Sequence, residues 1–159
     1  MEFSDWFRRC EGQWKSYRRY LYGSPHHTYV DGEVQGGNPP KVENLVTEFG
    51  VIANGDHRWK VSWESVRDDG KKASSGEMPM ELKGNQLIRA RAYMSYETNV
   101  TELERVDVDT VVFRSAYDGM TFREEIRFLD SDTMRLRQTV GYKSNGDVLL
   151  CGQYVEVRV

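Results

Sequence analysis

A charged hairpin carries the residues of this 159-residue sequence whose types and spacing best suit chemistry. Residues 121–129 and 135–142 alternate polar and apolar side chains, the pattern of two half-buried strands. The polar positions are Arg123, Glu125, Arg127, Arg135, Arg137 and Thr139. Arginine grips a carboxylate through two parallel hydrogen bonds, and a carboxylate accepts N–H groups. This face can therefore bind an acidic ligand, or it can be a solvated outer face with cross-strand charge pairs.

The loop of the hairpin decides which side chains share a face. Cross-strand neighbours point the same way, so matching apolar with apolar residues requires an odd number of loop residues. The segment Asp130–Asp132 supplies a loop of three residues. This register predicts that Glu125, Arg135 and Arg137 lie together on one face.

The elements that position the hairpin follow from periodicity and turn residues. Ser4 is a candidate N-cap for a short helix that buries Trp6, Phe7 and Cys10, and Gly12 is a typical stop. Beyond the helix, turn signals recur every ~8–12 residues, as in a sandwich or a closed barrel. The expected strands are residues 14–22, 27–30, 42–52, 59–66, 87–93, 98–105, 110–116, 121–129, 135–142 and 148–159.

The segment Gly12-Gln13-Trp14, directly after the short helix, favours the barrel. It resembles the G-x-W signature of lipocalins and their calycin relatives, in which a helical turn closes one barrel end. The resemblance implies that Trp14 packs under an arginine of the last strand, for which Arg158 is the candidate. We therefore expect one domain over residues 1–159, an all-β closed antiparallel lipocalin-like barrel of about ten strands with a short N-terminal helix.

Composition narrows the classes of protein and site. The formal net charge of -3 argues against nucleic acid as the main partner. No apolar run approaches the ~20 residues of a membrane-spanning helix, and the first residues do not form a secretory signal. We expect Cys10 and Cys151 to be independent thiols of a cytoplasmic protein. His26 and His27 are adjacent, so on a strand they point to opposite faces, and we expect no metal site.

The sequence resembles the S-type phycobiliprotein lyases, the CpcS or CpeS family, along its whole length. The segments that carry the resemblance are Gly12-Gln13-Trp14-Lys15-Ser16-Tyr17-Arg18, Val61-Ser62-Trp63-Glu64, Glu125 with Arg135-Leu136-Arg137, and the ending from Cys151 to Arg158. The resemblance implies a ten-stranded barrel, a catalytic carboxylate at Glu125, and ligand-binding roles for Arg18, Trp63, Arg135 and Arg137. Two positions depart from the pattern: Leu21 stands where the family often has His, and Asp69 where it often has a second Trp.

By this resemblance the chain is expected to be a bilin lyase. Such an enzyme binds a linear tetrapyrrole, phycoerythrobilin or phycocyanobilin, and transfers it to a cysteine of a phycobiliprotein apo-subunit. The bilin is a substrate, so no permanently bound cofactor is expected, and a homodimer is possible. The expected location is the cytoplasm, or the plastid stroma of an alga. A non-catalytic carrier of bilins or fatty acids is the alternative, and Leu21 and Asp69 are the departures that keep it open.

Overall fold

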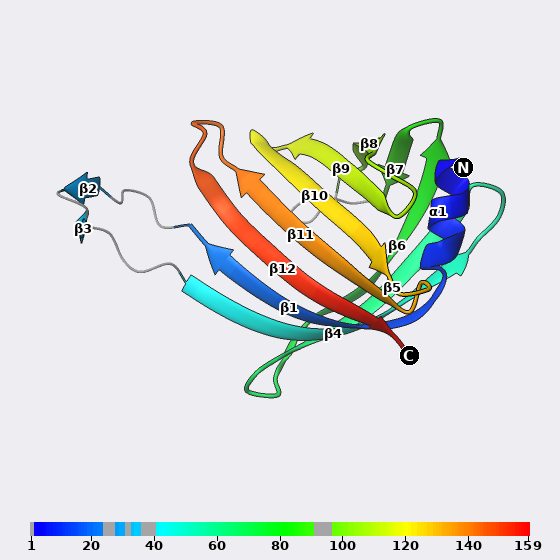
Figure 1. Cartoon of the computed structure of the whole chain (residues 1–159), viewed down its shortest axis with the longest axis horizontal. Coiled ribbons are helices and arrows are strands. Elements are labelled where there is room, and N and C mark those ends of the chain that lie inside the picture. Colours follow the sequence, from blue (N-terminus) through cyan, green and yellow to red (C-terminus); the bar gives the residue numbers. More distant parts are fainter. Residues whose placement is uncertain (1, 24–27, 31–32, 36–40, 91–96) are drawn as a thin grey trace.

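The computed structural model describes residues 2–23, 28–30, 33–35, 41–90 and 97–159. Ten strands close into an antiparallel barrel in the order β1-β12-β11-β10-β9-β8-β7-β6-β5-β4, and β2 and β3 pair separately. Helix α1 covers one end of the barrel (Figure 1). The elements are α1 (Phe3–Cys10), β1 (Gly12–Tyr22), β2 (Thr28–Val30), β3 (Glu33–Gln35), β4 (Lys41–Ala53), β5 (Arg58–Arg67), β6 (Lys72–Lys83), β7 (Gln86–Arg89), β8 (Asn99–Arg105), β9 (Thr110–Tyr117), β10 (Met120–Leu129), β11 (Met134–Tyr142) and β12 (Val148–Arg158). The predicted barrel with its short helix is confirmed.

Two details at the level of single elements differ from expectation. The helix begins at Phe3 and its N-cap is Glu2, not Ser4, because the Glu2 backbone N–H is satisfied by the Asp5 carboxylate at 3.0 Å. Strands β3 and β6 are absent from the expected set, and in β6 Gly76 and Pro79 weaken the apolar alternation. Gly12 does follow the helix end, with a φ of +123°.

The end of the barrel under α1 is filled by hydrophobic side chains, here called the base. Helix α1 contributes the buried Trp6, Phe7 and Cys10. The Trp6 ring lies edge-on to Phe128, with ring centroids 5.5 Å apart, and Phe7 stacks on Trp59 at 5.1 Å. Because these strand residues come from opposite parts of the sheet order, the helix closes this end of the barrel.

Two guanidinium groups lie over the Trp14 ring in the base. Arg158 is 4.4 Å and Arg135 is 4.5 Å from the ring centroid. The predicted contact between Trp14 and Arg158 is confirmed. Arg158 also donates hydrogen bonds to the backbone carbonyls of Arg9, Glu11 and Asp132. Gly12 is required here because a Cβ would lie 2.6 Å from Arg158 Nη1.

The predicted register of the β10–β11 hairpin is wrong. Leu129 pairs with Met134, so the loop has four residues, Asp130 to Thr133, instead of three. Asp130, Ser131 and Asp132 all have positive φ angles, of 39°, 57° and 67°. The even loop length reverses the faces of one strand relative to the other. As a result, inward-pointing residues of β10 neighbour the arginines of β11, and Glu125 is turned outward.

Candidate functional site

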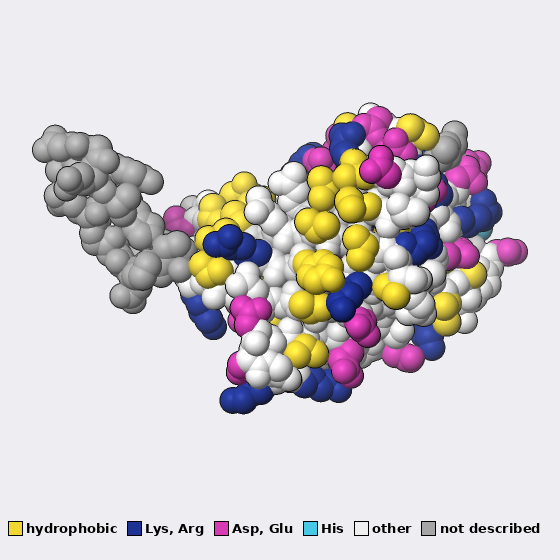
Figure 2. Space-filling view, turned by 60° about the horizontal axis from the view of Figure 1, so that its bottom comes forward, with side chains coloured by type: hydrophobic (Ala, Val, Ile, Leu, Met, Phe, Trp, Pro, Cys, Tyr) yellow, Lys and Arg dark blue, Asp and Glu magenta, His cyan; other side chains and the backbone are white. Residues whose placement is uncertain are grey.

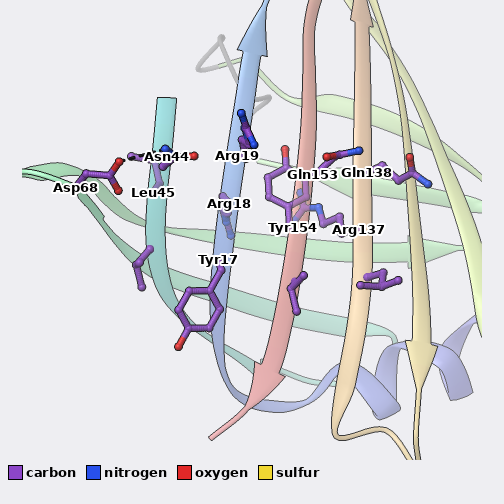
Figure 3. Close-up of a pocket in the computed structure, with 13 residues that line it drawn as sticks. Tyr17, Arg18, Arg19, Asn44, Leu45, Asp68, Arg137, Gln138, Gln153 and Tyr154 are labelled. Atoms are coloured by element: carbon purple, nitrogen blue, oxygen red, sulfur yellow. Dashed lines mark hydrogen bonds between the residues drawn. The ribbon is translucent and has the colours of Figure 1, made fainter. Parts of the chain in front are cut away.

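Beyond the base, the barrel interior carries a band of hydrogen-bonded polar side chains. We call it the polar layer, and its members are Ser16, Arg18, Glu124, Arg135, Arg137, Thr139, Tyr154 and Glu156. They come from β1, β10, β11 and β12, which alternate inward polar residues with outward residues. Figure 3 shows Arg18, Tyr154 and Arg137 on the neighbouring strands β1, β12 and β11.

Glu156 is the most deeply buried charge of the polar layer, with an exposed fraction of 0%. Its carboxylate accepts a hydrogen bond from Arg135 Nε at 2.5 Å and another from Ser16 Oγ at 3.1 Å. Arg137 Nη1 lies 3.8 Å from it. Burial acts to raise the pKa of Glu156, but Arg135, Arg137 and Arg18 together lower it below its ordinary value. The neighbouring arginines therefore favour the anionic form of Glu156.

Glu124 is the second buried carboxylate and has a different environment. It accepts hydrogen bonds from Arg137 Nη2 at 2.6 Å and from Thr139 Oγ1 at 3.0 Å. The Tyr154 hydroxyl donates to Thr139 at 3.3 Å, which extends the chain of hydrogen bonds. Burial raises the pKa of Glu124 to about 7, against the lowering effects of Arg89 and Thr139. Two carboxylates with pKa values moved in opposite directions suit acid–base chemistry at neutral pH.

Aromatic rings line the polar layer on the side of β1 and β12. Arg18 donates to Ser16 Oγ at 3.0 Å, and its guanidinium lies over Tyr154 at 5.3 Å and over Phe49 at 5.9 Å. Tyr20 meets Tyr154 edge-on with ring centroids 5.4 Å apart. A flat ligand with acidic arms would find both rings and guanidinium groups here.

The structure brings together three of the five predicted site residues. Arg18, Arg135 and Arg137 all belong to the polar layer, and Arg135 is 4% exposed. Trp63 lies on β5, paired with Phe49 and packed against the base. It therefore belongs to the inner wall, two strands from β1 in the barrel order.

Glu125 does not belong to this site. It points outward and forms an ion pair with Arg123 at 3.0 Å on the outer face. The resemblance implied that Glu125 is the pocket carboxylate, and the predicted register put it on one face with Arg135 and Arg137. In the structure the inward carboxylate of β10 is its neighbour Glu124. The sequence did carry a signal for it, because Glu124 falls in step with the apolar Phe122, Ile126 and Phe128.

Arg89 is a further site residue that the sequence analysis missed. It lies on β7, is 7% exposed, and donates to Thr101 Oγ1 at 2.7 Å and to Asn99 Oδ1 at 3.4 Å. Burial lowers the pKa of Arg89, and the negative charge of Glu124 opposes that effect. Its alternation with Leu87 was the available signal, because both then face inward.

Other residues singled out in the sequence have ordinary surroundings. By register Leu21 points outward, paired with Val42 and Cys151, and Asp69 lies in the exposed turn between β5 and β6. Cys10 and Cys151 are free thiols, as predicted. His26 and His27 lie outside the described residues, and within the described ones no group of three or more His, Cys, Asp or Glu side chains could hold a metal ion.

Two pockets lie on or through the barrel wall. One of about 560 Å³ spans β4, β1, β12 and β11, and most of its lining side chains, such as Tyr17 and Gln153, belong to the outward-pointing set (Figure 3). The other, of about 340 Å³, is lined by residues of β8 and β9 and of the segments next to them. None of the helices in the described ranges is long and apolar enough to cross a membrane.

Comparisons with known proteins agree with one another. The model of the CpeS-like protein family matches residues 38–159. A putative chromophore lyase CpcV of Picosynechococcus sp. is 27% identical over 165 residues, covering 96% of this chain and 79% of that protein. A putative phycocyanobilin lyase CpcS 2 of Nostoc sp. is 25% identical over 172 residues, covering 98% of this chain and 89% of that protein.

Among solved structures, the S-type phycobiliprotein lyase CPES from Guillardia theta has the same fold. It superposes with a TM-score of 0.70 at 17% identity, covering 100% of this chain and 93% of that one. Rv2717c from M. tuberculosis gives a TM-score of 0.59 at 12% identity, covering 95% and 93%. The match of the family model extends from β4 through the polar strands to the last strand. The chain therefore belongs to the CpeS-like protein family.

Proposed function

We propose that this protein is a bilin lyase, which binds a phycobilin in its barrel and attaches it to a cysteine of a phycobiliprotein subunit. The charge of the interior is the observation that carries the proposal. Arg18 and Arg137 lie inside the barrel over the ring of Tyr154, and Arg135 lies beside them against Glu156. Guanidinium groups bind carboxylates through charge-assisted hydrogen bonds. A phycobilin is a flat tetrapyrrole with two propionates, so it offers both a ring system and carboxylates to such an interior.

Within the polar layer, the arginines have different roles. Arg18 and Arg137 both lie over the ring of Tyr154 on β12, and we assign them to a propionate. Arg135 was predicted to bind ligand directly, but it lies over Trp14 and bonds to Glu156. We assign it a positioning role: it holds Glu156, which in turn orients Arg137. Trp63 is assigned to a ring face of the bilin.

Glu124 takes the catalytic role that the sequence predicted for Glu125. A carboxylate there can accept the pyrrole N–H groups and exchange a proton with the conjugated system. In the reaction, the client thiol sulfur bonds to the A-ring ethylidene carbon, and the C=C π pair enters the ring system. The thiol proton is lost to solvent and the ring system takes up one proton through Glu124. No atom leaves, so the adduct contains every atom of both reactants.

The nucleophile comes from the client subunit and not from this chain. Cys10 is buried in the base, and burial raises the pKa of its thiol to about 11. Cys151 points outward, paired with Leu21 and Val140. The contribution of the barrel is then to hold one bilin conformer with one ring face open to attack. Because the bilin is consumed, we propose no permanently bound cofactor.

Co-expression with a client apo-subunit and a supply of phycocyanobilin or phycoerythrobilin tests the proposal. The expected result is a covalent, zinc-fluorescent adduct on the client. Arg137→Ala should abolish correct attachment, whereas Arg123→Ala, at an exposed outer-face arginine, should leave it intact. A coloured barrel beside an unmodified client would instead support a bilin carrier, and no colour with either bilin would refute both the lyase and the bilin carrier.

The proposed partners also include a second copy of the chain. Tyr17, Val46, Val66, Val155 and Leu136 are cross-strand neighbours on the outer face, here called the outer apolar row. Figure 2 turns the lower side of Figure 1 forward and shows hydrophobic side chains gathered there. We propose this row as the homodimer contact. We also propose that the protein is located in the cytoplasm, or in the plastid stroma of an alga. Light scattering should show a dimer that Tyr17→Glu converts to a monomer, and an unchanged mass would refute the assignment.

A further inference from the structure

Tyr154 on β12 connects two rows of inward-facing residues. By register its own row contains Arg137 on β11 and Arg18 on β1. The next row contains Glu124 on β10 and Thr139 on β11. The Tyr154 hydroxyl donates to Thr139 Oγ1 at 3.3 Å, so it leaves its own row and reaches the row of the carboxylate. Figure 3 shows Tyr154 on the strand between those of Arg18 and Arg137.

A glycine leaves the space that this hydroxyl occupies. Gly152 is the buried β12 residue that pairs with Thr139. A Cβ at Gly152 would lie 2.8 Å from Tyr154 Cζ and closer still to the hydroxyl oxygen. Because the tyrosine ring is rigid and packs edge-on against Tyr20, it would have to shift as a whole. Position 152 therefore seats the tyrosine hydroxyl against Thr139.

The Thr139 hydroxyl has a single proton, and its two partners decide where that proton points. Because Thr139 accepts from Tyr154, its own proton is directed to Glu124 Oε2, at 3.0 Å from Thr139 Oγ1. A donor directed at a carboxylate fixes its orientation and favours its anionic form. Without the tyrosine hydroxyl, the threonine hydroxyl is free to rotate away from the carboxylate.

Charged groups on other strands also act on Glu124. Arg137 on β11 donates to its carboxylate at 2.6 Å. Burial and the charge of Glu156 on β12 raise its pKa to about 7, against the lowering effects of Arg89 on β7 and Arg18 on β1. These groups are all retained when only the tyrosine hydroxyl is removed. The effect of that hydroxyl can therefore be measured against a constant background.

We propose that Tyr154 is a positioning residue of the bilin lyase, whose hydroxyl orients the Glu124 carboxylate through Thr139 while its ring holds the two propionate-binding arginines. This inference rests on the proposed function. The guanidinium groups of Arg18 and Arg137 lie 5.3 Å and 5.1 Å from the ring centroid. One rigid side chain thus fixes the groups that bind the propionate relative to the group that exchanges a proton with the tetrapyrrole.

Tyr154→Phe tests the hydroxyl because it keeps the ring. In the bilin-free protein, NMR of isotope-labelled glutamate carboxyls follows the titration of Glu124, whose signal is identified by its absence in Glu124→Gln. The pKa of Glu124 should rise above the wild-type value by about 0.5–1 pH units in Tyr154→Phe. Tyr142→Phe is the matched control, because Tyr142 is an exposed tyrosine of β11, and it should titrate as the wild type does.

A double-mutant cycle tests whether the hydroxyl acts through Thr139. Thr139→Val keeps the shape of the side chain and should raise the pKa of Glu124 at least as much as Tyr154→Phe does, whereas Thr139→Ser should keep the wild-type value. Adding Tyr154→Phe to Thr139→Val should cause no further rise. Gly152→Ala retains the tyrosine but fills its seat, so it should raise the pKa as Tyr154→Phe does. It keeps the inference testable if Tyr154→Phe does not fold.

Bilin binding and attachment separate the roles of the hydroxyl and the ring. Tyr154→Phe should slow single-turnover attachment about 5-fold or more while changing the affinity for phycocyanobilin less than about 2-fold. Tyr154→Leu, which also removes the ring, should in addition weaken that affinity about 5-fold or more. Equal losses of rate and affinity in Tyr154→Phe would show that the tyrosine is only structural.

The outcomes separate this inference from the proposed function. An unchanged titration of Glu124 in Tyr154→Phe, or additive rises in the double variant, would overturn the inference while wild-type attachment of bilin still occurs. If the wild type attaches no bilin, the proposed function fails, and the role of Tyr154 in attachment fails with it. In that case the NMR titrations still report whether the hydroxyl acts on Glu124.

Discussion

Replacing Glu124 and Glu125 separately by glutamine contrasts two neighbouring carboxylates that the barrel sends to opposite faces. Glutamine keeps the size of the side chain and removes its charge. At position 124 the change removes the anion that Arg137 contacts at 2.6 Å inside the barrel. At position 125 it removes only an outer-face ion pair with Arg123. The two variants make the same chemical change at an inward-pointing and at an outward-pointing position. A difference between them therefore reports on the direction of the side chain.

The two variants should differ by more than tenfold in their effect on the rate of bilin attachment. General acid–base catalysis contributes about 10²–10⁴ in rate, so Glu124→Gln should slow bilin attachment at least 100-fold. Bilin affinity should fall less, by about 10-fold, because Arg137 keeps Glu156 at 3.8 Å. An exposed ion pair contributes about 0.2–1 kcal/mol, so Glu125→Gln should change rate and affinity less than about 5-fold.

A single-turnover assay measures both effects. Each purified variant is loaded with phycocyanobilin, mixed with an apo-subunit, and the zinc-fluorescent adduct is followed on denaturing gels. Absorbance titrations give the affinity in parallel. Loss of attachment in Glu125→Gln with full activity in Glu124→Gln would refute the face assignment. Full activity in both would refute the role of Glu124 in proton transfer.

Three further predictions concern stability. The pKa of Glu124 is about 7 in the folded protein, above its ordinary 4.5. Its contribution to the free energy of unfolding is therefore fully present below pH 4.5 and is lost as the pH rises through 7. This amounts to roughly 3 kcal/mol, so wild-type stability should fall relative to Glu124→Gln between pH 4.5 and 8 in urea titrations. Gly12→Ala should lower the free energy of unfolding by about 1–3 kcal/mol. Gly55→Ala is the control and should cost less, because Gly55 has a similar φ but a Cβ there would meet no atom closer than 3.9 Å. Equal melting temperatures of the two variants would contradict the close approach at Gly12. Glu156→Gln should lower the free energy of unfolding by about 3–5 kcal/mol, because it leaves the buried Arg135 without its carboxylate partner. Adding Arg135→Met should restore most of the lost stability, as measured by chemical denaturation. No recovery would contradict the pairing of Arg135 with Glu156.

The architecture could be predicted from the sequence because its signals are local. Turn residues recur at hairpin spacing, and a short amphipathic helix precedes Gly12 and Trp14. The contact between Trp14 and Arg158 joins distant positions, yet each residue lies in a recognisable segment. Such features depend on backbone preferences and apolar patterning, which a single sequence displays directly.

The faces of the polar strands could not be predicted because the barrel interior is itself charged. Matching apolar with apolar residues across the hairpin assumes that the barrel interior is apolar. Under this assumption Arg135 and Arg137 are predicted to lie on the same face as Glu125. In β12 the same reasoning would bury Val155, which is 43% exposed, and expose Glu156, which is fully buried. The interior charges are tolerated because they compensate one another across strands, and that compensation becomes visible only once the register is known.

The seam between β1 and β12 has a consequence for the folding kinetics. Arg158 bonds to the carbonyls of Arg9 and Glu11, which lie 149 and 147 positions earlier in the chain. Contacts at such separations carry a large loop-closure entropy and slow the search for the native topology. The hairpins from β4 to β12 can each form from neighbouring residues, whereas closure waits for the two ends of this series to meet. Refolding should therefore be limited by the closing of this seam, and substitutions there should slow refolding more than substitutions within the hairpins do.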